Sequence, residues 1–149
     1  MDKTEEWKGH RTKIPKGRYL LKCIKAGKTG IWHEGKGGWA RSEKMILWFE
    51  VVQGEHVGKV VPMFLPLGQN GKVPQGSKYF TVWCIANGLR RPQRARLKEM
   101  PPQKFKDKVF EGEVVDVKPR WVTGRAQPEI FQYSRVDILY DLIIGNPDS

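Results

Sequence analysis

The stretch EKMILWFEVVQ, from Glu43 to Gln53, decides the fold because it is the clearest β-strand of the chain. Its apolar residues alternate, and the set that we predict to face the core is Met45, Leu47, Phe49 and Val51. The opposite face carries Lys44, Ile46, Trp48 and Glu50. Trp48 is therefore predicted to lie on the outer face as a stacking platform, whereas a register slip of one residue would place it in the core.

Four further strands and a helix are predicted around this stretch. A turn at Gly54–Gly58 leads into a strand at Lys59–Leu67, paired antiparallel to the first, and its prolines indicate an edge or a bulged strand. Ser77 as N-cap and Gly88 at C′ indicate a short helix. The remaining strands are predicted at Arg18–Ala26, Val109–Lys118 and Phe131–Ile143. This order predicts a mainly β fold, a five-stranded OB-like Greek-key barrel with one or two short helices between strands 3 and 4.

The 149 residues are expected to form one domain, with a flexible basic arm at 1–14, the OB-like domain at 15–144 and a tail at 145–149. Cys23 and Cys84 lie in apolar stretches and are interpreted as small core residues. No spacing of Cys or His indicates a zinc site, so no metal or cofactor is expected. The chain has no apolar run of membrane-spanning length and no apolar signal core, which favours the cytoplasm.

The charge of the chain favours a polyanionic partner. There are 27 Lys and Arg residues against 16 Asp and Glu, which gives a net charge of +11 and a pI near 9.8. The excess runs through both halves, with 14 basic and 7 acidic residues in 1–75 and 13 and 9 in 76–149. A distributed excess of this kind suits a long track along a nucleic acid better than a single anion pocket.

The segment KTGIWHEGKGGWAR, from Lys28 to Arg41, combines indoles, cations and glycines. It has neither helical nor strand periodicity, so we predict a loop that forms no packed element of its own. Indoles beside cations suit a flat, anionic ligand, and single-stranded nucleic acid meets both demands. The alternative is that the indoles fold back and seal one end of the barrel. The candidate binding residues of this segment are Lys28, Trp32, Lys36, Trp39 and Arg41.

A second loop of similar composition is PRWVTGRAQP, from Pro119 to Pro128, with Arg120, Trp121 and Arg125. In an OB fold the loops between strands 1 and 2 and between strands 4 and 5 flank the binding face on strands 2 and 3. Both aromatic, cationic loops fall at those positions. Lys44 and Trp48 on the second strand, and Tyr133 and Arg135 on the last strand, are predicted to extend this face. A structural pairing of Tyr133 and Arg135 across strands is an equal alternative.

Other charged segments are interpreted as non-catalytic. The run Arg90–Lys108 has eight basic and two acidic residues, and it is either a solvated connector or a stripe that contacts phosphates. The segment Gly54–Lys59 has the wrong spacing for a phosphate-binding loop and is interpreted as a hairpin. Glu111 and Glu113 share a strand face without a third ligand, so surface carboxylates are favoured over a nuclease centre. We therefore expect a binding protein and not an enzyme.

Three phrases carry a resemblance to a known group of proteins: IPKGRYLLK (14–22), FEVVQGEHVGK (49–59) and FKDKVFEGEVVDVK (105–118). Over residues 14–140 the arrangement resembles that of small proteins of bacteriophages and mobile elements. Members of that family are regarded as OB-like single-stranded DNA-binding proteins or their relatives. The resemblance implies the OB fold, a single-stranded DNA ligand and a role in DNA replication or recombination. The long Trp-bearing segment departs from the family pattern, and no catalytic motif is carried over.

The sequence thus predicts a single-stranded DNA-binding protein with weak sequence preference. Phosphates would be neutralised by Lys28, Lys36, Arg41, Lys44, Arg120 and Arg125, and bases would stack on some of Trp32, Trp39, Trp48 and Trp121. The alternatives are a binder of RNA, of duplexes or of junctions, a protein-interaction module with Trp anchors, and a nuclease. No membrane partner is expected, and the strand edge beside Pro62 is a candidate for pairing between copies of the chain.

Overall fold

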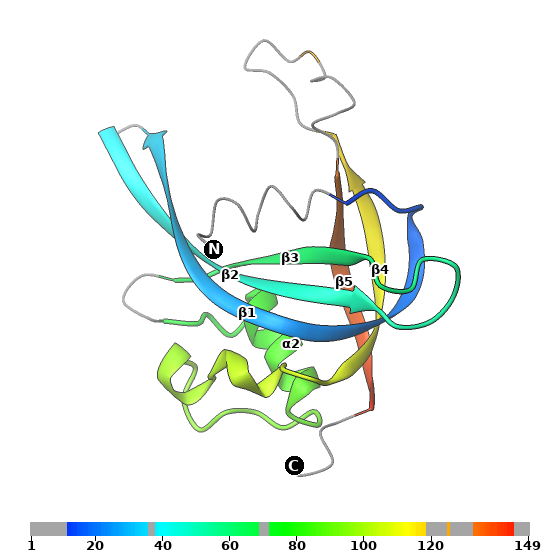
Figure 1. The fold of residues 1–149 in the computed structure, drawn as a ribbon. Helices are drawn as coiled ribbons and strands as arrows, with labels where there is room; N and C mark the ends of the chain where they lie inside the picture. The colour runs from blue at the N-terminus through cyan, green and yellow to red at the C-terminus, as the bar shows by residue number, and fades with distance from the viewer. Residues whose placement is uncertain (1–11, 36–37, 69–71, 119–124, 126–132, 145–149) are drawn as a thin grey trace.

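Five strands form one antiparallel sheet in the order β3-β2-β1-β4-β5 (Figure 1). The computed structural model describes residues 12–35, 38–68, 72–118, 125 and 133–144, with the backbone alone for 29–35, 38–42 and 144. The strands are β1 (Gly17–Gly35), β2 (Gly38–Val51), β3 (Val60–Pro66), β4 (Val109–Val117) and β5 (Tyr133–Ile144). Between β3 and β4 lie helix α2 (Lys78–Ala86) and the 3-10 turns η2 (Leu97–Glu99) and η3 (Pro102–Lys104).

The described strands form an open sheet, so the mainly β fold is confirmed and its closure into a barrel is not. Among the described residues, no backbone ladder joins β3 to β5, the two ends of the sheet. The sheet is nevertheless strongly curved, because β1, β2 and β3 run across β4 and β5 at a steep angle (Figure 1). This curvature brings the two ends near each other, and the ring centroids of Phe64 on β3 and Tyr133 on β5 lie 6.5 Å apart.

The alternation predicted for the second strand is confirmed. Met45, Leu47, Phe49 and Val51 are buried in the main core cluster. They pack with residues of every other strand, among them Leu21, Met63, Phe110 and Val136. Phe49 and Phe110 meet edge to face at 6.1 Å, and Phe110 also approaches Phe105 at 6.3 Å. Burial of this apolar set is the main stabilising contribution that the fold offers.

The segment Lys28–Arg41 is not a loop in the structure, which corrects that prediction. The ladder between β1 and β2 continues from the sheet to the pair Gly35 and Gly38, so both strands extend into a long hairpin. A ladder is made by backbone N–H and C=O groups, and it therefore needs no alternation of apolar and polar side chains. A bulge lies in β1 between Cys23 and Lys25, just beyond Lys22, the last residue of β1 that pairs with β4.

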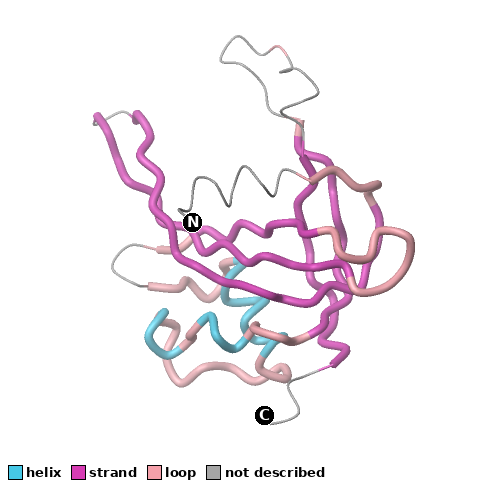
Figure 2. Tube along the Cα trace, viewed as in Figure 1, coloured by secondary structure: helices cyan, strands magenta, loops and turns pink. Residues whose placement is uncertain are grey.

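Helix α2 has the predicted caps. Ser77 Oγ accepts a hydrogen bond from Phe80 N at 3.2 Å, and Gly88 has a φ of +69° just beyond the C-terminal end. The buried residues of α2 are Tyr79, Val82, Trp83 and Ala86, so Trp83 is a core residue as predicted. The helix packs against β3 and β5 and closes one end of the curved sheet (Figure 2).

The end of the predicted N-terminal arm is part of the folded domain. Ile14 is buried, and Ser134 Oγ both accepts a hydrogen bond from Ile14 N at 2.9 Å and donates one to Ile14 O at 3.0 Å. Ser134 N also donates to Thr12 O at 2.8 Å. Thr12 and Ile14, from the end of the predicted arm, are thus hydrogen-bonded to β5. The rest of the arm, residues 1–11, and the tail at 145–149 lie outside the described residues.

Candidate nucleic-acid interface

The outer face of β2 and β3 brings aromatic and apolar side chains together. The register pairs Ile46 with Phe64, Trp48 with Pro62 and Lys44 with Pro66. Residues that oppose each other in an antiparallel ladder share one face, so these six side chains form two adjacent rows. Their core-facing neighbours Val61, Met63 and Leu65 are fully buried, which fixes the phase of β3. The outer face is consequently built from alternate positions of two strands that also form the core.

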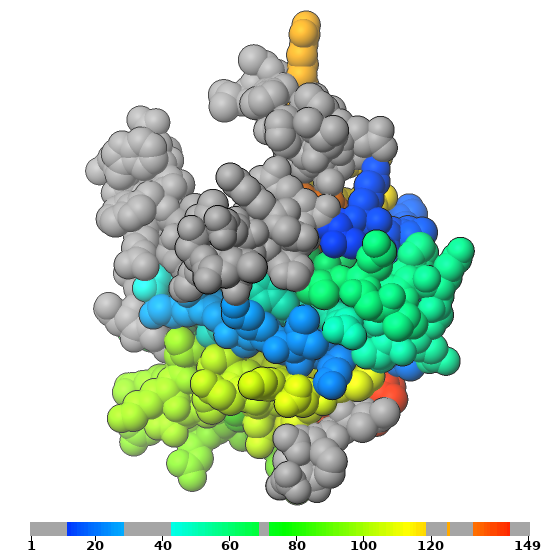
Figure 3. All heavy atoms as spheres, in the orientation of Figure 1, coloured from blue at the N-terminus to red at the C-terminus, as the bar shows by residue number. Residues whose placement is uncertain are grey.

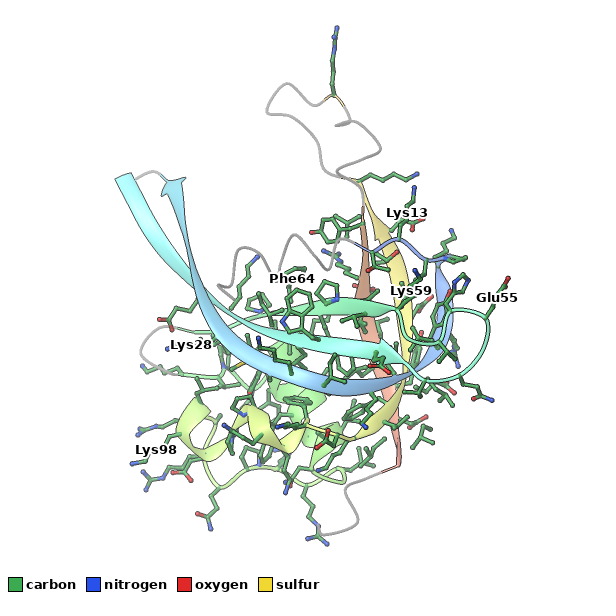
Figure 4. All side chains as sticks on the ribbon, in the orientation of Figure 1. Lys13, Lys28, Glu55, Lys59, Phe64 and Lys98 are labelled. Atoms are coloured by element: carbon green, nitrogen blue, oxygen red, sulfur yellow. The ribbon has the colours of Figure 1, made fainter. Side chains whose placement is uncertain are left out.

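Two side chains of β5 extend this surface across the open end of the sheet. The ring of Tyr133 meets that of Phe64 edge to face, with planes at 77°, and Arg135 lies two positions further along the same face of β5. We name these two side chains of β5, together with the six on the outer faces of β2 and β3, the outer band: Lys44, Ile46, Trp48, Pro62, Phe64, Pro66, Tyr133 and Arg135. Figure 4 labels Phe64 in the central part of the view.

Arg135 has an incompletely satisfied guanidinium group. Its Nε atom is buried and has no hydrogen-bond partner among the described residues. Its Nη2 atom lies 3.9 Å from Asp137 Oδ1, an oxygen that Lys78 Nζ approaches more closely at 3.4 Å. Because a carboxylate shared in this way neutralises Arg135 weakly, the guanidinium can still accept an anionic partner.

Trp48 occupies the predicted face but is not an open platform. Its side chain is only 7 % exposed, although it faces away from the main core cluster. A ring that is covered in this way cannot stack on a base unless the covering groups move. The register prediction is therefore confirmed for the strand, and the predicted exposure of Trp48 is wrong.

The hairpin places three predicted residues at neighbouring ladder positions. Trp32 lies opposite Arg41, and Trp39 lies opposite Glu34, two positions further toward the tip. In ladder phase these positions follow Met45, which faces the core, and not Trp48, which faces outward. The ladder phase thus assigns the backbone positions of Trp32 and Trp39 to one face and that of Trp48 to the other. At the base of the hairpin, the exposed Lys28 forms an ion pair with Glu43 at 3.4 Å.

The remaining predicted residues are described in part or not at all. Lys36, Arg120 and Trp121 lie outside the described residues, while Arg125 is described and exposed. The second predicted loop, Pro119–Pro128, lies outside them except for Arg125. The loop joins β4 to β5 and precedes Tyr133 in the sequence.

Phe64 belongs to the outer band and was not among the residues predicted from the sequence. The signal was present in the third strand, where Val61, Met63 and Leu65 alternate with Pro62, Phe64 and Pro66. The prolines obscured the alternation because they indicated an irregular strand. A β-strand has a period of two whatever its residues are, and Phe64 then falls on the face of Trp48.

A second polar cluster lies on β1, β4 and β5. Arg18 Nη1 forms an ion pair with Glu111 Oε1 at 3.0 Å, and its guanidinium carbon lies 4.2 Å from the centroid of the Tyr140 ring. Tyr140 donates a hydrogen bond to Glu113, which raises the pKa of the tyrosine. Every charge in this cluster has a partner of opposite charge or a hydrogen bond, so the cluster is a structural network on the sheet surface.

Two other features of the described residues bear on the kind of site. No group of three His, Cys, Asp or Glu side chains there is placed to hold a metal ion. None of the helices in that part of the chain has the length and apolar character needed to cross a membrane. Cys23 is a free, buried thiol, and burial raises its pKa from 9.0 to about 12, so it is a poor nucleophile at neutral pH.

Comparisons of the chain with protein-family models, with curated proteins and with solved structures give no match. The candidate interface therefore depends on the geometry of this chain alone.

Proposed function

We propose that this chain is a single-stranded DNA-binding protein that holds its ligand on the outer band and on the β1–β2 hairpin. The observation that carries the proposal is the outer band itself, in which the half-buried rings of Phe64 on β3 and Tyr133 on β5 meet, and which also carries the cations Lys44 and Arg135. Rings that accept bases by stacking, beside cations that neutralise phosphates, are the two elements of single-strand recognition. The proposed role is binding, without catalysis.

The connectivity supports an OB-like architecture as part of this proposal. Strand β1 pairs with both β2 and β4, and the helix lies between β3 and β4 in the chain. The two free edges, β3 and β5, approach each other through Phe64 and Tyr133. An OB fold is a partly open Greek-key barrel of this kind, with its ligand on strands 2 and 3. The outer band occupies the equivalent surface here.

Weak sequence preference is part of the proposal. The outer band offers rings and cations, and every base has a face on which it can stack. Arg135 and Lys44 are suited to phosphates, which are common to all sequences. Affinity should therefore depend on salt and on strand length more than on base identity. A role in DNA replication or recombination, as the family resemblance implies, would suit such a ligand.

Titration of a labelled dT oligonucleotide by fluorescence anisotropy tests the proposal, with Tyr133→Ala as the main variant. Stacking contributes ~1–3 kcal/mol per base, so the Kd should rise about 5- to 150-fold if Tyr133 contacts a base. Tyr140→Ala is the matched control, because Tyr140 lies on the same strand and outside the outer band. It should leave the Kd within about twofold of the wild-type value.

The outcome separates the proposed ligand from its rivals. A wild-type protein that binds dT no more tightly than heparin, or equal losses in the two tyrosine variants, would contradict a stacking site on the outer band. Tighter binding of RNA or of duplex DNA of equal length would reassign the ligand. Cleavage of the oligonucleotide on addition of a divalent metal would show that the protein is an enzyme.

A further inference from the structure

The connector between α2 and β4 carries an unusual surplus of positive charge. Seven cationic side chains, which we name the connector surface, are half-buried or exposed: Arg90, Arg91, Arg94, Arg96, Lys98, Lys104 and Lys106. Glu99 is the one acidic residue between the first and the last of them. Figure 3 shows the connector as a continuous yellow-green surface along β1.

These cations lack the carboxylate partners that four other described cations have. Among the described residues, Arg18, Lys28, Lys78 and Arg135 each lie within 4.0 Å of a carboxylate. No carboxylate in that part of the chain lies within this distance of any side chain of the connector surface. Acidic residues gather instead on the last two strands, as Glu111, Glu113, Asp116, Asp137 and Asp141. Among the described residues, the connector surface therefore stays without carboxylate neutralisation, at a cost in self-repulsion.

The connector is held in place although most of it is irregular. Tyr79 Oη donates to Met100 O at 2.6 Å, and Trp83 Nε1 donates to Pro101 O at 3.1 Å. Met100 and Phe105 are fully buried, and Lys108 Nζ donates to Ala86 O at 2.8 Å. Further along, Val73 N donates to Ala95 O at 3.1 Å. A cationic segment whose backbone is fixed before binding has less conformational entropy to lose when a polyanion binds.

The connector surface offers charge without stacking. The aromatic side chains of α2 and of the connector are Tyr79, Phe80, Trp83 and Phe105, of which all but Phe80 are buried. Phe80 is half-buried and packs against the core cluster. Contacts here would therefore be made to phosphates and not to bases, which fixes position without reading sequence.

A hollow connects this surface with β1. It has a volume of about 220 Å³ and is lined by Ile24, Lys25, Ala26, Pro102, Gln103 and Lys106. Lys25 comes from the bulge of β1 and Lys106 from the connector, so two lysines from distant parts of the chain border one hollow. Along β1 the next cation is Lys28 at the base of the hairpin. Figure 4 shows Lys28 and Lys98 toward the same edge of the view, whereas Lys13 and Lys59 lie toward the other.

We infer that the connector surface is a second contact for the phosphodiester backbone, reached by a strand that leaves the hairpin along Lys28 and Lys25. The inference rests on the proposed function, because it takes the polyanion to be a single-stranded nucleic acid. The connector neutralises phosphates of a longer strand, while the outer band and the hairpin contact its bases.

The triple variant Arg91→Gln, Arg94→Gln, Arg96→Gln tests this contact. Each phosphate contact with a single strand contributes about 0.7 to the slope of log Kd against log salt, so three lost contacts reduce the slope by about 2. If the variant and the wild type converge at 1 M salt, this reduction corresponds to about a hundredfold weaker binding at 0.1 M. The control Lys13→Gln, Lys16→Gln, Lys59→Gln removes the same charge from exposed positions and should change the slope by less than about half a unit.

An oligonucleotide with abasic ends distinguishes this contact from stacking. A short dT core followed by abasic sugar-phosphate units should bind wild type more tightly than the core alone, and the arginine variant should lose that gain. Equal slopes for the two triple variants, or no gain from the abasic units, would overturn the inference. Failure of the wild type to bind any oligonucleotide would instead overturn the proposed function. Unchanged thermal melting of both variants is expected, since the substituted side chains are exposed.

Discussion

Removal of the Ser134 hydroxyl is the sharpest test of how the N-terminal segment is fixed to the sheet. Ser134 is fully buried, and its Oγ accepts from Ile14 N at 2.9 Å and donates to Ile14 O at 3.0 Å. Ser134→Ala therefore leaves one backbone donor and one backbone acceptor unpaired in the interior. Each such group costs about 1–3 kcal/mol, and we expect a total loss of about 2–4 kcal/mol in the free energy of unfolding.

Two further hydroxyl deletions calibrate this value. Ser77→Ala removes the N-cap of α2 and should cost about 1 kcal/mol. Thr81→Ala removes an exposed hydroxyl that donates to Ser77 O at 3.2 Å, and its effect should stay within about 0.5 kcal/mol. The same chemical change is thus made in a buried bridge, at a helix cap and on the surface, and the expected cost falls in that order.

Urea unfolding at pH 7, followed by far-UV circular dichroism, gives the three free energies. With roughly 2–4 °C of Tm for each kcal/mol, a loss of ~3 kcal/mol for Ser134→Ala lowers Tm by about 6–12 °C. A loss for Ser134→Ala no larger than that for Thr81→Ala would refute the reasoning. Such a result would mean that Thr12–Ile14 can detach from β5 with little loss of free energy, although Ile14 is buried.

Three more predictions follow from the interior of the sheet and the helix. Gly112→Ala should cost about 1–3 kcal/mol by urea unfolding, because the added Cβ would lie 2.9 Å from Leu21 Cδ1 and 3.0 Å from Ile138 O. Gly27→Ala, which meets nothing within 4 Å, should be neutral or stabilising by up to about 1 kcal/mol. Burial raises the pKa of Cys23 from 9.0 to about 12. Above pH 9 the thiol of the unfolded chain therefore loses a proton that the folded protein keeps. The free energy of unfolding then falls by up to about 1.4 kcal/mol per pH unit. Cys23→Ala should flatten this decline between pH 9 and 10 in urea titrations, and an unchanged slope would contradict it. Tyr79→Phe removes the hydrogen bond to Met100 O, so it should lower the free energy of unfolding by about 1–2 kcal/mol and speed amide hydrogen exchange at Met100–Phe105. Amide exchange that stays slow would show that packing alone holds the connector.

The elements with a strict period or a clear cap could be predicted from the sequence. The alternation of 43–53 gave the buried face of β2, and Ser77 with Gly88 gave the limits of α2. Both signals are local, because a strand face and a helix cap depend on residues within a few positions. The antiparallel pairing of β2 with β3 could also be predicted from the sequence. The short turn at Gly54–Gly58 reverses the chain direction and places the next strand beside β2.

The structural features that could not be predicted depend on contacts between residues far apart in the chain. The hairpin at Lys28–Arg41 exists because each strand supplies backbone partners to the other, and pairing of that kind leaves no pattern in the side chains. The buried position of Ile14 likewise involves a residue far away in the chain, Ser134 on β5. The contact between Phe64 and Tyr133 requires the curvature of the whole sheet, which no single strand encodes.

The ladder phase would constrain the path of the single-stranded ligand that we propose. The outer band occupies one face of the β1–β2 ladder, and the hairpin positions Trp32, Trp39 and Arg41 follow the phase of the opposite face. A strand that reaches both must therefore pass around the ladder and cannot lie flat across it. At the base of the hairpin, Lys28 follows Lys25 on β1, and Lys25 borders the same hollow as Lys106 of the connector, so such a passage would meet cations from both segments. A path that turns there exposes successive phosphates to fixed charge, which is the arrangement that favours a bent single strand over a stiff duplex.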